Sequence, residues 1–370
     1  MRRVADNVVA WTEEPLTTDV ARALERLGRL ADVRYVAAMP DVHLSEHVCV
    51  GVVLATRELL YPVAIGQDIG CGVRAVRLAL GRRELDEKRL VRLLSLWARA
   101  IPVQRQKRRP ELTAELAPER LSVGGLRRIA EHDAGVTLGT LGRGNHFVEL
   151  DVDDDGELWL IVHSGSRGLG PAIAAHYRGD RPLASLVADS EPGRAFQNDV
   201  ACTVDWAREN RRRIADVALD CLRQLLRVEV LAVESIDGAH DFLRQELHFG
   251  EPHWVHRKGA NSASDGELAV IPGSMGAGCR LVSGRGHAAA LCSSSHGAGR
   301  ALSRSEARSR IGTAKLAREM GDVVYDERLA PQLCDEAPSA YKRLDRVMRA
   351  QLELTRTLQR LQPLCVYKGV

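Results

Sequence analysis

The stretch Ser293-Ser294-Ser295-His296-Gly297-Ala298-Gly299-Arg300 sets one imidazole between a run of hydroxyl side chains and two glycines. Small residues on both sides leave space around the His296 ring, and the N–H groups of a Gly-Ala-Gly turn can form a nest that binds an anion. Arg300 adds a planar guanidinium that suits phosphate. A Ser-rich surface loop is the alternative, so the interpretation depends on whether the pattern recurs elsewhere in the chain.

A second stretch of this character is Gly66-Gln67-Asp68-Ile69-Gly70-Cys71-Gly72. Its glycines bracket an Asp and a Cys three residues apart, and a tight turn there can aim both side chains at one point. A carboxylate and a thiolate that converge suit a borderline divalent ion such as Mn²⁺ or Zn²⁺. Cys71 could instead be a small buried hydrophobe. The density of glycine favours the ligand interpretation.

Three further stretches place a histidine among small or polar residues: Gly144-Asn145-His146, His163-Ser164-Gly165-Ser166-Arg167 and Gly238-Ala239-His240-Asp241. His146 opens a predicted strand, and His163 follows a predicted strand over 158–162. The spacing of His163 and Arg167 can present a metal ligand and a phosphate contact together. His240 is a further ligand candidate, with an ordinary buried histidine as the equal alternative.

Asp41 and His43 lie two residues apart in Met39-Pro40-Asp41-Val42-His43, ahead of a predicted buried strand over 48–55. On an extended segment both side chains face the same side. The pair could bind a metal, orient a neighbouring group, or form a structural hydrogen bond with each other.

Two loops suit phosphate or ribose, although neither is specific alone: His256-Arg257-Lys258-Gly259-Ala260 and Ile271-Pro272-Gly273-Ser274-Met275-Gly276. The densest basic run is 105–109, which could meet a polyanion. Because no aromatic residue is interleaved there, a solvated charge run is the stronger interpretation.

Amphipathic spacing predicts helices over 19–30, 85–100, 198–231 and 341–361, with short apolar strands between them. This mixture indicates an α+β fold with a β-sheet core, surrounding helices and a cleft for metal and nucleotide. The candidate chemical residues run from Asp41 to Lys368 without clustering in one half. We therefore expect residues 1–370 to form one large catalytic domain.

Composition limits the class of protein. Hydrophobic residues make up 45% and charged residues 27%, which is ordinary for a globular protein with a sizeable core. The 52 basic and 49 acidic residues give a net charge of +3, so any nucleic-acid binding must rest on local patches. The eight cysteines show no CxxC pair, which favours a reducing cytoplasm, and no apolar run reaches the length of a membrane span.

Taken in order along the chain, the motifs resemble the RtcB RNA-splicing ligases, which join RNA ends with GTP and manganese. The likeness is collinear over nearly the whole chain. It rests on Met-Pro-Asp-Val-His at 39–43, Asp-Ile-Gly-Cys-Gly at 68–72, Gly-Asn-His-Phe-Val-Glu at 144–149, His-Ser-Gly-Ser-Arg-Gly at 163–168, His-Arg-Lys-Gly-Ala at 256–260, Pro-Gly-Ser-Met-Gly at 272–276, Ser-His-Gly-Ala-Gly-Arg at 295–300 and Lys368-Gly369.

The resemblance implies that His296 takes GMP from GTP as a phosphoramidate. It implies one Mn²⁺ on Asp68, Cys71 and His146, and a second on Cys71, His163 and His240, with the thiolate bridging. The residues it assigns to the guanylate are Asn145, Glu149, Ser274, Cys279, His296, Gly297, Gly299, Tyr341 and Lys368. Those it assigns to phosphates are Arg167, Lys258 and Arg300.

The substrates implied are RNA 3'-phosphate or 2',3'-cyclic phosphate ends, which are sealed to 5'-hydroxyl ends. An alternative is a paralogue that guanylylates RNA or DNA 3'-phosphate ends without efficient sealing. A third is a metal- and nucleotide-binding module without catalysis, against which the intact His296 argues. The sequence leaves open whether an accessory activator takes part.

Three departures from the family pattern stand out. Ser45-Glu46 replaces the usual Gly-Lys, Asp241 replaces the Asn after the metal histidine, and Cys279 replaces a serine near the guanine. These changes leave the metal and nucleophile set intact. They bear on the choice of substrate and on the contacts to the base.

Overall fold

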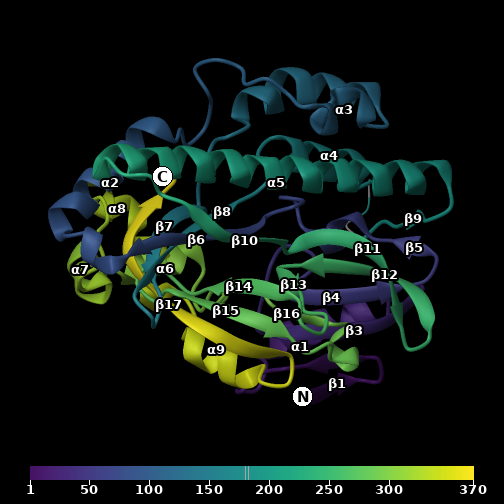
Figure 1. The fold of residues 1–370 in the computed structure, drawn as a ribbon. Helices are drawn as coiled ribbons and strands as arrows, with labels where there is room; N and C mark the ends of the chain where they lie inside the picture. Colours follow the sequence, from purple (N-terminus) through teal and green to yellow (C-terminus); the bar gives the residue numbers. More distant parts are fainter. Residues whose placement is uncertain (180, 182) are drawn as a thin grey trace.

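The computed structural model describes residues 1–179, 181 and 183–370, and shows two large sheets with helices packed around them (Figure 1). Strand pairs within the sheets are antiparallel except β2 with β3, in the part of the chain that is described. Helices and mainly antiparallel strands together confirm the α+β class.

The first sheet has six strands in the order β1-β2-β3-β4-β12-β11. Their bounds are β1 Arg2–Ala5, β2 Val8–Ala10, β3 Val33–His43, β4 Val50–Thr56, β12 Glu251–Lys258 and β11 Asp241–His248. Strand β4 agrees with the buried strand predicted over 48–55, because its β-branched and small side chains fill both faces of the sheet. Helix α1 (Thr18–Gly28) covers one face with Val20, Leu24 and Leu27.

The second sheet has seven strands in the order β10-β6-β8-β7-β17-β15-β14. Their bounds are β10 Ala232–Ala239, β6 Gly72–Gly81, β8 Glu157–Ser164, β7 Phe147–Val152, β17 Thr355–Lys368, β15 Cys279–Gly284 and β14 Leu268–Pro272. Two short ribbons complete the strands: β13 Ala260–Ser262 with β16 Ser293–Ser295, and β5 Leu59–Leu60 with β9 Leu186–Val187.

Helix α5 (Glu191–Leu226) spans the molecule above the second sheet, with α2 (Glu87–Ala100) beside it (Figure 1). Trp97 of α2 donates its indole N–H to the carbonyl of Ala218 at 3.2 Å. The long helix was predicted to start at 198. It starts earlier because the Ser190 hydroxyl accepts the N–H of Gly193 and caps the first turn. The other helices are α3 Gly124–Ile129, α4 Leu169–Tyr177, α6 Arg304–Arg310, α7 Thr313–Met320, α8 Ala330–Leu333 and α9 Leu344–Ala350.

The helix predicted over 341–361 is wrong. Only α9 (Leu344–Ala350) is helical there, and the chain then enters β17 between β7 and β15. Leu354, Leu358 and Leu361 have helical spacing by coincidence. Pairing with strands on both sides supplies main-chain hydrogen bonds along the segment, and this tertiary context overrides the local pattern.

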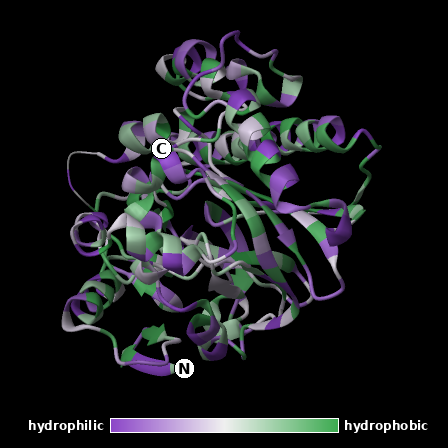
Figure 2. Ribbon diagram, turned by 90° about the vertical axis from the view of Figure 1, so that its left-hand side faces the viewer, coloured by the Kyte–Doolittle hydropathy of each residue, from purple (hydrophilic) through white to green (hydrophobic). Residues whose placement is uncertain are grey.

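Colouring by hydropathy shows hydrophobic and hydrophilic residues alternating along the outer helices (Figure 2). This is the pattern of helices that bury one face against a sheet. Among the residues described, no helix combines the length and the apolar character needed to cross a membrane.

Candidate active site

A cavity of about 600 Å³ has walls from both large sheets and from the β16 turn. It contains all the site residues named from the sequence except Arg167 and Cys279. Those on its wall are Asp68, Cys71, Asn145, His146, Glu149, His163, His240, Lys258, Ser274, His296, Gly297, Gly299, Arg300, Tyr341 and Lys368. Residues that are far apart in the sequence therefore meet in one place.

The candidate metal ligands meet because their strands are neighbours in the second sheet. His240 follows β10, Cys71 precedes β6, His163 lies near the end of β8, and His146 precedes β7. These four strands are adjacent and antiparallel, so the end of one strand and the start of the next lie at the same edge. The topology brings the four side chains together at this edge.

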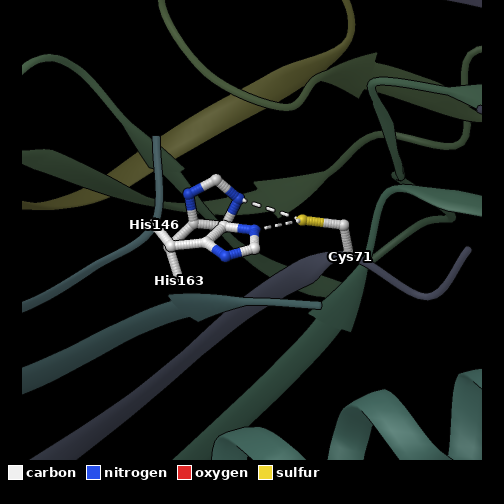
Figure 3. Close-up of side chains that lie close together, drawn as sticks. All are labelled: Cys71, His146 and His163. Atoms are coloured by element: carbon white, nitrogen blue, oxygen red, sulfur yellow. Dashed lines mark hydrogen bonds between the residues drawn. The ribbon is translucent and has the colours of Figure 1, made fainter. Parts of the chain in front are cut away.

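Two of these imidazoles aim one ring nitrogen each at the Cys71 sulfur (Figure 3). The Sγ atom lies 3.5 Å from Nε2 of His146 and 3.4 Å from Nε2 of His163. The opposite nitrogen, Nδ1, faces a main-chain carbonyl in both rings, that of Leu141 at 2.9 Å and that of Asn145 at 3.2 Å. Each Nδ1 therefore carries the proton, and each Nε2 lone pair is free for a metal.

Asp68 closes the cluster on one side. Its Oδ2 lies 3.3 Å from His146 Nε2, while its Oδ1 accepts hydrogen bonds from the Ser166 N–H and hydroxyl. Gly165 makes this approach possible, because a Cβ there would lie 2.2 Å from the Asp68 carboxylate. The glycine in the His-Ser-Gly-Ser motif thus makes room for the Asp68 carboxylate, a candidate ligand.

His240 and Asp241 close the other side. The His240 ring centroid lies 5.3 Å from that of His163, and both His240 and Asp241 place a ligand atom within 4.8 Å of the Cys71 sulfur. Asp241 also accepts the N–H of Gly259 at 2.7 Å. The sequence showed Asp241 only as a departure from the family, and its position adds it to the candidate ligands.

Burial sets the protonation of this cluster. It lowers the pKa of His163 and of His240 well below the usual value, so both rings are neutral and can bind a metal. Burial and the Asp68 charge raise the pKa of the Cys71 thiol, and a bound cation would reverse this shift. The mixture of carboxylate, thiolate and imidazole donors fits Mn²⁺, Zn²⁺ or Co²⁺.

His296 follows the short strand β16, and its ring is held by Asp41 of β3. Nδ1 of His296 lies 2.6 Å from Oδ2 of Asp41, and the same oxygen accepts the N–H groups of His296 and Gly297. Of the N–H groups predicted to form an anion nest, that of Gly297 therefore binds a side chain of the protein, while that of Ala298 donates to the Pro272 carbonyl. Gly299, at φ +71°, is required because a Cβ there would lie 2.3 Å from the Asp41 carbonyl oxygen.

Asp41 is the most important residue whose role the sequence left open. Of the possibilities for the Asp41 and His43 pair, the structure shows the first orienting a neighbouring group, while Nδ1 of His43 bonds to the Asp41 carbonyl at 2.9 Å. Nothing local links residue 41 to residue 296. The signal that was present is an acid in the otherwise apolar segment 36–42 of β3.

The electrostatics of His296 differ from those of the cluster. Burial opposes a positive charge on the ring, but the fully buried Asp41 carboxylate outweighs it and raises the pKa of His296. Burial likewise opposes the charge on Asp41, and His296 outweighs it to lower the pKa of that carboxyl. Because Nδ1 donates to Asp41, Nε2 is the nitrogen left to react.

Glu336 organises the far end of the cavity and was not recognised in the sequence. Its two oxygens accept from Lys368 at 2.6 Å, Tyr341 at 2.8 Å, Arg304 at 2.7 Å and Arg300 at 3.3 Å. Burial opposes the negative charge, but Lys368 and Arg304 lower the pKa of Glu336. Three predicted contact residues therefore share one internal carboxylate.

Two predicted contacts lie outside the cavity wall. Arg167 donates to the Thr140 hydroxyl at 3.3 Å. Its guanidinium and the His146 ring both lie beside Gly142, which leaves room for them because it has no side chain. Cys279 is buried in the core, with its sulfur 3.6 Å from Oε1 of Glu149. Lys258 does line the cavity, and its ammonium donates to the Val48 carbonyl.

Comparison with known proteins agrees with this geometry. Residues 24–132 and 125–369 match the family model described as tRNA-splicing ligase RtcB. The RNA-splicing ligase RtcB of Escherichia coli (strain K12) is 33% identical over 400 residues, which cover 98% of this chain and 97% of that protein. The chain belongs to the RtcB family. The resemblance inferred from the motifs is confirmed.

Other RtcB proteins match over similar lengths. The tRNA-splicing ligase RtcB of Nanoarchaeum equitans is 28% identical, with 99% of this chain and 94% of that protein covered. The RNA-splicing ligase RtcB of Mycobacterium tuberculosis is also 28% identical, with 91% and 97% covered. The likeness to RtcB therefore extends over both sheets.

Proposed function

We propose that this RtcB-family chain is a GTP-dependent ligase that seals RNA 3'-phosphate or 2',3'-cyclic phosphate ends to 5'-hydroxyl ends. The observation that carries the proposal is His296, whose Nδ1 is held by Asp41 in the cavity that also contains the Cys71 cluster. The names of the relatives supply RNA as the substrate. We also propose that residues 1–370 act as one catalytic unit, because the cavity wall runs from His43 to Lys368.

In the first step, Nε2 of His296 attacks the α-phosphorus of GTP. The new bond is P–N, the bond from that phosphorus to the bridging oxygen breaks, and pyrophosphate leaves. No proton needs to leave the ring, because attack by neutral imidazole produces an imidazolium that keeps its Nδ1 proton. The Asp41 carboxylate, 2.6 Å from Nδ1, stabilises that positive charge.

A 2',3'-cyclic phosphate must first be opened by water, which breaks the bond from phosphorus to the 2'-oxygen and leaves a 3'-phosphate and a 2'-hydroxyl. The RNA 3'-phosphate then takes GMP from His296, and the ring returns to neutral imidazole. The 5'-hydroxyl attacks the activated 3'-phosphate and gives up its proton to solvent, a phosphodiester forms, and GMP leaves. We assign one Mn²⁺ to Asp68, Cys71 and His146, and a second to Cys71, His163 and His240. Cations held there neutralise phosphate charge during both transfers.

For the guanylate we propose contacts from the cavity wall at Asn145, Glu149, Ser274, Gly297, Gly299, Tyr341 and Lys368. Glu336 would hold Lys368 and Tyr341 in place for the nucleotide. Lys258 and Arg300 are the phosphate candidates on the wall. Cys279 could act on the base only through Glu149, which it contacts.

One observation favours a second candidate function. Ser45 and Glu46 line the cavity, and Glu46 brings an anion where the family pattern has a cation. An anion there would weaken the hold on a second phosphate-bearing strand. The chain could then guanylylate RNA or DNA 3'-phosphate ends without sealing them efficiently.

The test incubates the full chain with GTP, Mn²⁺ and labelled strands that carry a 3'-phosphate, in the presence of strands with a 5'-hydroxyl. RNA and DNA strands of the same sequence run in parallel. A joined RNA product is the expected result. Capped but unjoined strands would favour the second function, and bound GTP with neither product would mean a binding module. A cytoplasmic location and an accessory activator stay predictions.

A further inference from the structure

Outside the Cys71 cluster, three acidic side chains converge over strand β17. Glu149 and Asp151 lie two residues apart on β7 and share one face of that strand. Cys279 begins β15, which lies on the other side of β17. One ligand atom from each of the three residues lies within 4.8 Å of the others.

The charge of Asp151 has no partner among the described residues. Asp151 is 0% exposed, and neither of its carboxylate oxygens has a hydrogen-bond partner there. The surroundings are apolar, since Cys279 belongs to the same core cluster as Phe147, Leu361 and Val366. Two carboxylates and a thiol in such a place are costly unless they take up protons or a cation.

Lys368 is the cation that acts on Glu149, but its ammonium already donates to Glu336 at 2.6 Å. Burial consequently raises the pKa of Glu149 and of Cys279 well above the usual values, and that of Asp151 to about 7. These shifts describe a cluster whose positive neighbour, Lys368, is already paired with Glu336.

The spacing of the donor atoms matches a metal site. Bond lengths of about 2.3 Å to sulfur and about 2.0 Å to oxygen or nitrogen, at tetrahedral angles, separate the two donors by roughly 3.5 Å. The Cys279 sulfur lies 3.6 Å from Oε1 of Glu149. In the Cys71 cluster, the corresponding distances from Sγ to Nε2 are 3.5 Å for His146 and 3.4 Å for His163.

We propose that Glu149, Asp151 and Cys279 hold a divalent cation of the zinc class, separate from the ions of the Cys71 cluster. Any proton on these groups passes to solvent when the cation binds. Glu149 lines the cavity, so the ion can enter from there. Because Oε1 is the oxygen that faces Cys279, Oε2 is left for a ligand in the cavity.

The alternative is that protons alone fill the cluster, with the Cys279 thiol donating to Glu149 and one proton shared by the two carboxylates. In that case the cluster has no affinity for metal. The two accounts therefore differ in the number of ions that the protein binds. This difference does not depend on whether the chain joins RNA.

The test titrates the chelator-treated full chain with Zn²⁺ against a coloured competing chelator, and counts bound metal by mass spectrometry. Asp151→Asn and Cys279→Ser keep the size of their side chains, so the fold should survive, and thermal melting checks this. Each should bind one ion fewer per chain than wild type. Cys71→Ala is the matched control and should keep the ion at Cys279.

A second readout uses Co²⁺ in the Cys71→Ala background, where an absorption band from thiolate to cobalt should remain. Adding Cys279→Ser should remove that band. Equal Zn²⁺ stoichiometry in wild type and Asp151→Asn would overturn the proposal and leave the proton-filled cluster. Labelling of His296 by GTP in the same samples reports separately on the ligase proposal, so the two can fail independently.

Discussion

Two sets of histidines share one cavity and behave in opposite ways. Burial lowers the pKa of His163 and of His240, whereas the pKa of His296 is raised although burial also opposes a charge on its ring. The difference lies at Nδ1. In His163 this nitrogen faces a main-chain carbonyl and in His240 it has no partner among the described residues, but in His296 it faces the Asp41 carboxylate.

The comparison shows how one residue type can fill two roles a few ångströms apart. A ring held by a carbonyl is neutral and offers Nε2 to a metal. A ring held by a carboxylate can carry a positive charge after Nε2 has formed a bond. The His240 and His296 ring centroids are only 4.8 Å apart, so the carboxylate at Nδ1, and not the distance, distinguishes the proposed nucleophile from the candidate ligand.

The sharpest way to break this comparison is to remove one histidine from each set. His296→Ala should abolish labelling by α-labelled GTP, a loss on the order of 10⁶-fold, and leave the Mn²⁺ content unchanged. His240→Ala should lose labelling and one of the two ions, because His240 is assigned to the second ion only. Metal analysis beside the labelling assay checks this. A His296→Ala protein that still takes label would contradict the assignment.

Asp41→Asn should make the surroundings of His296 resemble those of His163 and His240, whose Nδ1 atoms face none of the described carboxylates. The guanylylation rate should fall on the order of 10⁴-fold, because the amide no longer fixes the tautomer or stabilises the imidazolium. In wild type the rate should rise with pH until the raised pKa of His296 is passed, since only the neutral ring has a free Nε2. Without Asp41 burial is opposed only by the weaker effects of Asp241 and the Gly259 backbone, so the pKa of His296 should fall and the midpoint should move to lower pH.

The measurement for Asp41→Asn is a pH profile of single-turnover labelling in both proteins, with Mn²⁺ binding as the control. A midpoint that stays in place would mean that Asp41 does not set the pKa of His296. A midpoint at higher pH in Asp41→Asn would mean that Asp41 lowers the pKa of His296, the opposite of what we expect.

Cys71→Ala tests the candidate metal cluster, with which His296 is compared. The thiolate is assigned to both ions, so its loss should weaken Mn²⁺ binding at both positions by more than about 100-fold. The hydrogen bond between His296 and Asp41 should persist, because neither residue contacts Cys71 in the bonds described. Equilibrium dialysis with Mn²⁺ measures the effect. Two ions that remain tightly bound would refute the bridging assignment.

The smallest expected effect concerns Asp241, whose pKa burial raises to about 7. Below that pH the carboxyl is mostly protonated and adds little to a cation, and above it the carboxylate adds negative charge beside Cys71. Asp241→Asn should therefore weaken Mn²⁺ binding by about tenfold at pH 8 and hardly at all at pH 6. If Asp241→Asn and wild type bound Mn²⁺ with equal affinity at both pH values, Asp241 would be excluded as a ligand.

Local pattern was enough for much of the fold. Helix α2 and strand β4 follow from apolar spacing, and the start of α5 was missed by only a few residues because Ser190 caps it. The segment 341–361 failed for a different reason. Its leucines fit a helix, but pairing of β17 with two other strands decides the structure, and such pairing is not encoded locally.

The site shows the same limit. Glycine-flanked His, Cys and Asp marked the metal cluster and His296, because close packing around a ligand needs small residues. The role of Asp41 stayed open because its partner His296 lies 255 residues away, and Glu336 was missed because it gathers side chains from 5 to 36 residues away. Cys279 was named through family resemblance and Arg167 also from its spacing to His163, and the side-chain directions that take both off the cavity wall depend on the tertiary fold.

The most direct test of the account is to map the covalent adduct. The full chain is incubated with GTP and Mn²⁺, digested under alkaline conditions that preserve a phosphoramidate, and sequenced by mass spectrometry. The account predicts GMP on the peptide that contains His296, and phosphorus resonance spectra of the adduct should show attachment at Nε2. GMP on His146, His163 or His240, or attachment to His296 at Nδ1, would contradict it.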